Sequence, residues 1–302
     1  MKKVLLSSVV ALALLSGNVL AEEAKTAQSG TASKAVSASA VSHGKAAATA
    51  KRDDVKIVQE AVDAVRLTQE VLMTLSAKEV DKDKAIKTLE KAIGKLEVVM
   101  SNPKAPALIP LSSSVVVSEF PGTAYDVENA VITSIALLQN KRVQDARMIV
   151  QGLKDEIDLI TINLPLASYP AALKLAAKYL HEDKVEEARR VIATALNTFV
   201  EVDVITPIGI IQAQELIVAA QMAAPKDKKL ALAHLAAAKA ALKKAEALGY
   251  TSISDTTYQM LTDAITEIEK EIRGKNKPEK LFEALIEKLR EFKEKAVKSV
   301  SK

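Results

Sequence analysis

The sequence predicts an all-α protein whose multi-helix body consists of stacked helical hairpins. Ala, Leu, Lys and Glu abound, whereas Gly and Pro contribute only nine residues each of 302, and this composition favours helices. Apolar residues also recur three, four or seven positions apart from residue 55 onward, which is the spacing of amphipathic helices. The third observation is a degenerate repeat of about 42 residues, a period typical of repeated helical hairpins.

The first 21 residues are predicted to form a secretory signal peptide. Lys2-Lys3 provides a basic start, residues 4–15 an apolar stretch, and Val19-Leu20-Ala21 a cleavage signal. An uncleaved membrane anchor is the alternative, but an apolar run of about a dozen residues is short for a span, which needs roughly 20. We therefore expect cleavage after Ala21, a periplasmic location and no stable membrane insertion of the mature protein.

Residues 22–51 are predicted to form a disordered linker. They are mostly Ala, Ser, Thr and Lys, with few large apolar side chains to bury. A segment of this composition cannot offset the entropy cost of ordering its backbone. The structured body is therefore expected at 52–273.

Within the body and the C-terminal segment, amphipathic periodicity predicts ten helices. Their expected ranges are 54–75, 82–100, 124–140, 143–162, 170–181, 184–201, 207–223, 227–248, 255–273 and 279–299. One segment near 109–118 is instead expected to be extended or a short strand. It lies between prolines and contains the β-branched run Val115-Val116-Val117.

The repeat is marked by an alanine and by a proline that follows it. Ala146 and Ala188 are each followed by apolar residues or Ala at the same helical spacing, and then by Pro165 and Pro207. A proline is tolerated at the first position of a helix, where its missing N–H is no loss. With Thr206 as a suitable N-cap, each proline signal is expected to end one helix and begin the next.

The C-terminal residues 274–302 are predicted to form a flexible joint followed by an amphipathic helix. Leu281, Leu285, Leu289 and Phe292 share one face of that helix. The helix is expected to pack on the body or to pair with another subunit. The acidic residues between its basic ones argue against strong binding to an anionic membrane.

Charge and cysteine content exclude several kinds of protein. The chain has no cysteine, so disulfides, thiol catalysis and cysteine-based metal sites are absent. The formal charge of +4 includes a local excess of five basic residues after residue 269, and no basic face is interleaved with aromatic residues. The pattern is therefore not that of a nucleic-acid-binding protein.

Four stretches together resemble the YfdX family of exported bacterial proteins. They are IPLSSSVVVSEF, NLPLASYPAALKLAAKYL, ITPIGIIQAQELIVAA and ALAHLAAAKAALKKAEALGY; their order and spacing carry the likeness, which is expected over residues 53–270. The resemblance implies a helical periplasmic protein that forms oligomers and is associated with envelope stress. It implies no enzymatic activity, so it transfers no catalytic residues to this chain.

The search for chemistry yields one pair of polar candidates. Residues 208–224 are apolar on nearly every side of the expected helix, yet Gln212 and Glu215 share one face. A buried Glu215 would need a partner or a raised pKa; the alternative is a polar stripe that faces water or another subunit. His43, His181 and His234 form no local metal-binding cluster, and no phosphate loop or nucleophile elbow is present. We expect no catalytic residues, cofactor or metal.

Three functions remain open from the sequence. The first is a non-enzymatic, chaperone-like protein that binds peptides or small amphiphiles on apolar surfaces between its helices. The second is a structural homo-oligomer without a small ligand. An enzyme centred on Glu215 is the third, and the lack of a nucleophile–base set or metal cluster in the sequence argues against it.

Overall fold

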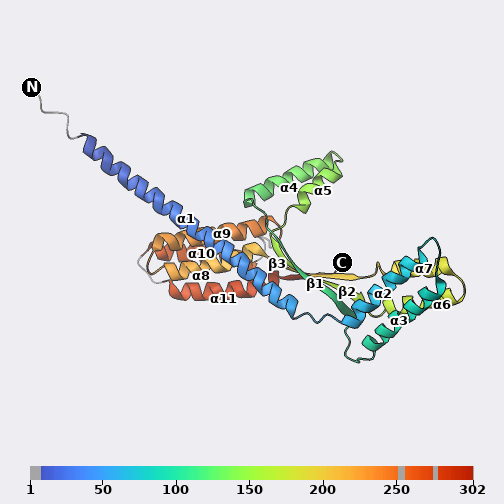
Figure 1. Ribbon diagram of the computed structural model, residues 1–302. Coiled ribbons are helices and arrows are strands. Elements are labelled where there is room, and N and C mark those ends of the chain that lie inside the picture. The colour runs from blue at the N-terminus through green and yellow to red at the C-terminus, as the bar shows by residue number, and fades with distance from the viewer. Residues whose placement is uncertain (1–7, 251–255, 275–277, 302) are drawn as a thin grey trace, which may run out of the picture. The chain divides into compact units, whose positions relative to one another are not determined.

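The computed structural model describes residues 8–250, 256–274 and 278–301, which form two compact units. Unit 1 comprises residues 1–46, 117–157 and 206–297, and unit 2 comprises 47–116, 158–205 and 298–302. Helices dominate both units, and the predicted mostly helical fold is confirmed (Figure 1). Residues 1–7 of the predicted signal peptide and 275–277 of the predicted joint lie outside the described residues.

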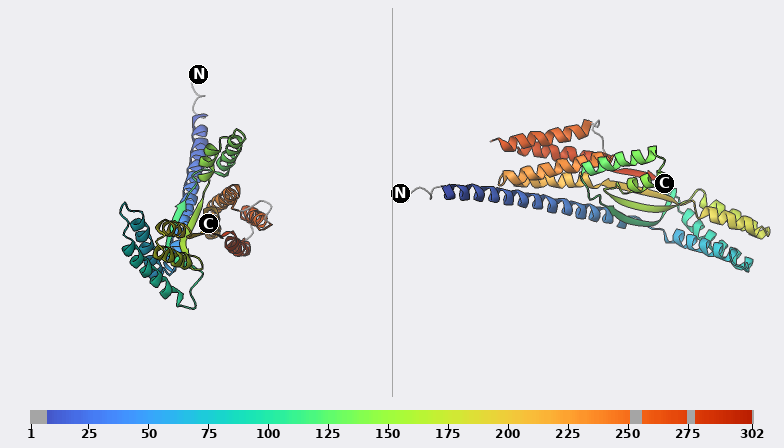
Figure 2. Two further views of the ribbon diagram at one scale, coloured as in Figure 1. Left: turned by 90° about the vertical axis from the view of Figure 1, so that its right-hand side faces the viewer. Right: turned by 90° about the horizontal axis from the view of Figure 1, so that it is seen from above.

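The centre of unit 1 is a bundle of four helices. They are α8 (Ile208–Ala223), α9 (Lys228–Ala247), α10 (Thr256–Arg273) and α11 (Glu279–Ala296). Helix α8 packs on α9 and α11, and α10 packs on α9 and α11; Figure 2 shows this group, in orange to red, side by side. Because α8 contacts neighbours on several sides, its apolar residues need not be confined to one stripe.

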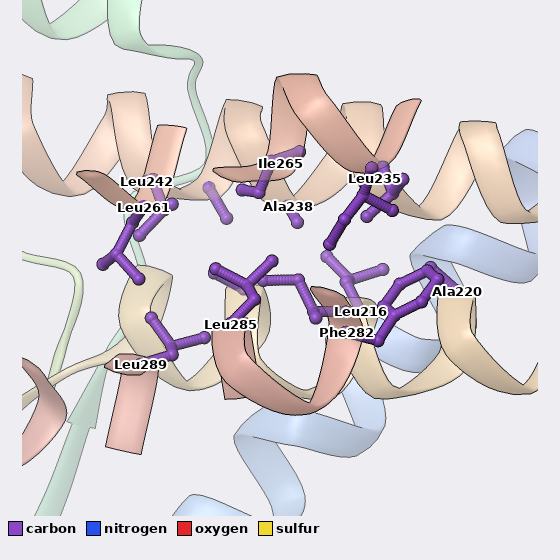
Figure 3. Close-up of a cluster of buried hydrophobic side chains, with 14 of the residues drawn as sticks. Leu216, Ala220, Leu235, Ala238, Leu242, Leu261, Ile265, Phe282, Leu285 and Leu289 are labelled. Atoms are coloured by element: carbon purple, nitrogen blue, oxygen red, sulfur yellow. The ribbon is translucent and has the colours of Figure 1, made fainter. Parts of the chain in front are cut away.

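The core of this bundle contains apolar side chains from all four helices. Leu216, Leu235, Ile265 and Leu285 are among those that point toward one another in Figure 3. The C-terminal helix α11 contributes Phe282, Leu285, Leu289 and Phe292, all buried. The C-terminal helix was predicted either to pack on the body or to pair with another subunit. In the structure α11 packs on the body and contributes to its core.

Two helices connected by a short turn, α4 (Ala124–Gln139) and α5 (Val143–Gln151), form a hairpin that also belongs to unit 1. Helix α4 packs on α5 and on α9. Its first turn has a capping box in which the Thr123 hydroxyl accepts from the Asp126 backbone N–H, and the Asp126 carboxylate accepts from the Thr123 N–H. This arrangement satisfies two backbone donors at the start of the helix.

Residues 22–51 lie in a long helix instead of the predicted disordered linker. Helix α1 (Ser8–Asp53) is continuous through this range. Ala40 and Val41 are buried, and Gly44 approaches so closely that an added Cβ would lie 2.7 Å from a methyl group of Ile157. Alanine is the best helix former, and small side chains allow α1 to lie close to its neighbours. The prediction considered large apolar side chains only, so it missed this mode of packing.

Unit 2 combines two helical hairpins with most of a small sheet. Helix α2 (Gln59–Leu75) packs on α3 (Lys82–Met100), and α6 (Tyr169–His181) packs on α7 (Val185–Ala195). The two pairs meet through contacts of α3 with α6 and of α2 with α7. Tyr169 is fully buried in their shared core, where its ring stacks on Phe199 at 5.7 Å.

Four strands form one sheet in the order β1-β2-β3-β4. They are β1 (Leu108–Ser118), β2 (Glu156–Pro165), β3 (Val200–Pro207) and β4 (Lys298–Ser301), and β3 and β4 are antiparallel. Strand β1 is the extended segment predicted near 109–118. The other three strands were not predicted, because the expected helices 143–162, 184–201 and 279–299 continued through the starts of β2, β3 and β4. Their β-branched residues, such as Ile157 and Ile160, are what favours a strand there.

The predicted repeat is a helical hairpin followed by a strand. Hairpin α4–α5 leads into β2, which ends at Pro165, and hairpin α6–α7 leads into β3, which ends at Pro207. The repeated proline therefore ends a strand rather than a helix. Thr206 is not the cap of α8: Pro207 occupies the N-cap position and makes no side-chain hydrogen bond. The Ile208 N–H donates instead to the Asp155 carbonyl oxygen at 2.9 Å.

Candidate functional site

A buried polar network lies in unit 1, where the segment before β2 meets the end of α9. Asp155 and Lys244 form an ion pair with 2.9 Å between Oδ2 and Nζ, and their side chains are only 2% and 16% exposed. Lys244 also donates to the carbonyl oxygen of Phe120 at 3.0 Å, while the Phe120 N–H donates to Asp155 at 3.1 Å. Asp155 thus connects the segment before α4 with α9, and through its carbonyl with α8.

Tyr250 joins the network because of the way α9 ends. Gly249 has a φ of +81°, and the N–H groups of Gly249 and Tyr250 donate to the carbonyls of Glu246 and Ala245. This is a Schellman motif, which favours glycine at the left-handed position. The Tyr250 hydroxyl accepts from the Asp155 N–H at 3.1 Å and donates to the Glu156 carboxylate at 2.5 Å. Lys154 pairs with the same carboxylate at 2.9 Å.

Burial alters the acid–base behaviour of this network. Burial raises the pKa of the Asp155 carboxyl, and Lys244 opposes that shift by favouring the charged form. The pKa of the Tyr250 phenol is also raised, chiefly by burial and then by its hydrogen bond to Glu156. The phenol therefore stays protonated and acts as a hydrogen-bond donor. We interpret the network as a structural junction whose lysine also faces an adjoining cavity.

That cavity, called here the α4 groove, has a volume of about 520 Å³. Its walls come from α1, the start of α4, α8 and α9. It is lined by Ser37, Gly122, Thr123, Ala124, Tyr125, Gln212, Ala237, Ala240, Ala241, Lys243 and Lys244. The size is within the range of small-molecule sites, and four alanines make much of the wall apolar. Lys243 and Lys244 are the charged residues in this lining.

The two residues predicted as polar candidates have different surroundings. Gln212 lines the α4 groove, so it lies beside a cavity as a binding residue would. Glu215 does not line that groove; it is half-buried and contacts His43 of α1, with 2.8 Å between Oε1 and Nδ1. Glu215 has the partner that its place on an apolar helix requires, but that partner is an exposed histidine.

The other two histidines are separate from this pair. His234 is buried on α9, where its Nδ1 lies 3.0 Å from the Ser33 hydroxyl of α1, and burial lowers its pKa. His181 ends α6 in unit 2 and is exposed, as expected for a solvated helix end. Among the residues that the structure describes, no three His, Asp or Glu side chains form a group suited to a metal ion.

A second feature of unit 1 is an apolar surface on the α4–α5 hairpin. Only a few of the hairpin's side chains are buried, and many large apolar ones are exposed to solvent. We call this surface the α4–α5 face, and it comprises Tyr125, Val131, Ile132, Ile135, Leu138, Val143, Met148 and Val150. Val131, Ile135 and Leu138 are spaced by four and three residues, so they share one side of α4. A helical hairpin that exposes this many large apolar side chains is a candidate interaction surface.

Sequence reasoning missed both features for different reasons. Asp155 and Lys244 are far apart in the chain, and each sits among other charged residues, so neither gave a local signal. The α4–α5 face was readable as an amphipathic stripe, but a stripe alone does not tell a core-facing side from an exposed one. Within the described ranges, no helix is both long enough and apolar enough to cross a lipid bilayer.

The fold defines a mostly helical protein built from helical hairpins and one small sheet, with an open apolar hairpin face. Residues 64–205 match the family described as YfdX protein. The match is shorter than the predicted extent of 53–270: it includes the α4–α5 face, Asp155 and Glu156, but not Lys244 or Tyr250.

The structure also has a solved neighbour, YfdX of Salmonella Typhi. The two are 20% identical in sequence, and the alignment covers 49% of this chain and 91% of that chain, with a TM-score of 0.34. Among proteins with curated descriptions, none matches this chain.

Proposed function

We propose that this chain is a non-enzymatic, chaperone-like protein that holds apolar segments of other polypeptides on the α4–α5 face. The observation that carries the proposal is the exposure of large apolar side chains on that face, with Ile132 at 64% and Leu138 at 51%. An unfolded polypeptide exposes apolar residues, and covering both surfaces together removes apolar area from water. The peptide ligands expected from the sequence fit such a surface.

The proposal includes the cellular setting expected from the sequence. The N-terminal 21 residues support export to the periplasm with cleavage after Ala21, and the family resemblance supports a role under envelope stress.

Suppression of client aggregation tests this function. The client is insulin whose disulfides are reduced with dithiothreitol, a reductant that leaves this cysteine-free chain unchanged. We expect residues 22–302 to suppress turbidity in proportion to their concentration. The double variant I132S/L138S should lose most of this effect, because it removes apolar surface without disturbing the core.

A matched control separates the face from general surface hydrophobicity. Met73 and Val98 of unit 2 are exposed to a similar degree, at 67% and 58%. The variant M73S/V98S should therefore suppress aggregation as the unmodified protein does. Equal loss in both double variants, or no suppression by the unmodified protein, would refute the proposed function.

Self-association is the second candidate, and the same face favours it. A second copy could cover the α4–α5 face of the first and form the homo-oligomer expected from the sequence. Light scattering over a wide concentration range tests this candidate. It requires an oligomer for the unmodified protein and a monomer for I132S/L138S; a monomer in both cases removes it.

A further inference from the structure

The α4 groove has the charge and lining of a site for a small anionic ligand. Lys244 is already paired with Asp155, whereas Lys243 is exposed and forms no ion pair with the described residues. Of the two lysines in this lining, Lys243 is therefore the one without a carboxylate partner in the described part of the chain. The nearby Asp126 carboxylate is engaged by the first turn of α4, where the helix N-terminus carries partial positive charge.

The apolar part of the groove lies next to these lysines. Ala237, Ala240 and Ala241 of α9 present small side chains that leave room for a ligand. Tyr125 lines the groove and also belongs to the α4–α5 face, and Ile132 follows it two helical turns along α4. An alkyl chain that starts in the groove therefore has an apolar path along α4.

We propose that the α4 groove binds a single-chain fatty carboxylate. Its monoanionic headgroup pairs with Lys243, and its alkyl chain lies against the alanines of α9 and Tyr125. One unpaired lysine suits one carboxylate, which accepts a charge-assisted hydrogen bond from an ammonium group. The inference rests on the proposed binding function and deepens it by naming a ligand class. Its headgroup site at Lys243 lies in the groove, whose lining does not include Ile132 or Leu138.

The absence of tryptophan allows a direct measurement. In Y125W the only tryptophan lies at the edge of the groove, and its emission reports ligand binding there. We expect a saturable emission change on titration with dodecanoate below its micelle concentration. Dodecyltrimethylammonium and dodecyl maltoside, which share the alkyl chain but lack the negative charge, should bind at least about tenfold more weakly.

Two charge reversals locate the headgroup. K243E in the Y125W background should weaken dodecanoate binding by about tenfold or more. K226E changes charge equally at an exposed lysine outside the groove and should leave the affinity unchanged. No saturable signal, equal affinity for the three amphiphiles, or an equal effect of the two reversals would overturn the inference.

The proposed chaperone-like function is tested separately with the same variant. K243E should still suppress aggregation of reduced insulin, because the α4–α5 face is intact. If K243E loses dodecanoate and keeps suppression, both proposals stand. If I132S/L138S keeps both activities, the client-binding proposal fails while the amphiphile site stands.

Discussion

Asp155 and Lys244 form an ion pair at 2.9 Å, and the carboxylate is almost fully buried. Removing one partner of such a pair leaves the other charge buried without compensation. We predict that K244M lowers the free energy of unfolding by about 3 kcal/mol, measured by urea denaturation followed by circular dichroism. K243M, at the exposed neighbour on α9, should stay within about 0.5 kcal/mol of the unmodified protein.

The K244M defect should also depend on pH. Burial raises the pKa of Asp155, and without Lys244 the opposing effect is lost. A carboxyl whose folded pKa lies above its unfolded value binds a proton more tightly when folded, so stability falls as pH rises. The difference in stability between K244M and the unmodified protein should therefore be larger at pH 8 than at pH 5. An equal difference at both pH values would show that the loss of stability in K244M does not come from an uncompensated Asp155 charge.

Gly209 allows α8 and α9 to approach each other closely. A Cβ at this position would lie 2.6 Å from the Ala241 carbonyl oxygen, a backbone atom that cannot simply rotate away. We predict that G209A lowers the free energy of unfolding by about 1–3 kcal/mol, as overpacking does. G94A in the middle of α3, where nothing lies within 4 Å of the new Cβ, should instead stabilise by about 0.5–1 kcal/mol. A neutral G209A would mean that the two helices are not held at this distance.

His234 should make stability sensitive to mild acid. Burial lowers its pKa below the ordinary value of 6.5, so the unfolded chain binds the proton more tightly than the folded one. Stability is then fully present above about pH 6.5 and decreases as the pH falls toward the folded pKa. We expect H234Q, which keeps a polar side chain near Ser33 and cannot titrate, to flatten the dependence between pH 7 and 5. H181Q, at an exposed histidine of unit 2, is the control for losing a histidine.

The helical state of residues 29–46 can be tested by hydrogen exchange. In the structure this segment of α1 is helical, and its Ala40 is buried within unit 1. We predict that its amides are protected in residues 22–302, and that A40D lowers the protection because it buries a charge. A38D, two residues away on an exposed position, should preserve it. Random-coil exchange rates in the unmodified protein would instead favour the disordered linker.

The helical hairpins could be predicted because their burial follows local periodicity. Leu89, Ala92 and Leu96 of α3 recur at three and four residues, and all three are buried. Strands β2 and β3 were missed because their apolar residues continue the pattern of the preceding helices, and short apolar runs are ambiguous between the two states. Only β-branched residues such as Ile157 favour a strand over a helix in these runs.

The candidate sites were less predictable than the fold. Gln212 was found because its polarity contrasts with an apolar helix, and it does line the α4 groove. The pairing of Asp155 with Lys244 depends on how β2, α4 and α9 meet, which no local pattern encodes. The close approach of α1 to Ile157 and Ile211 likewise depends on small residues such as Gly44. No local sequence pattern identifies these contacts.

Photo-crosslinking from the α4–α5 face tests the central claim most directly. Because the chain has no cysteine, I132C accepts a single benzophenone label, and M73C in unit 2 provides a label at a similarly exposed site. We predict that reduced insulin is crosslinked from position 132 and not from position 73. Equal crosslinking from both positions, or adducts only between copies of this chain, would contradict client binding on the α4–α5 face.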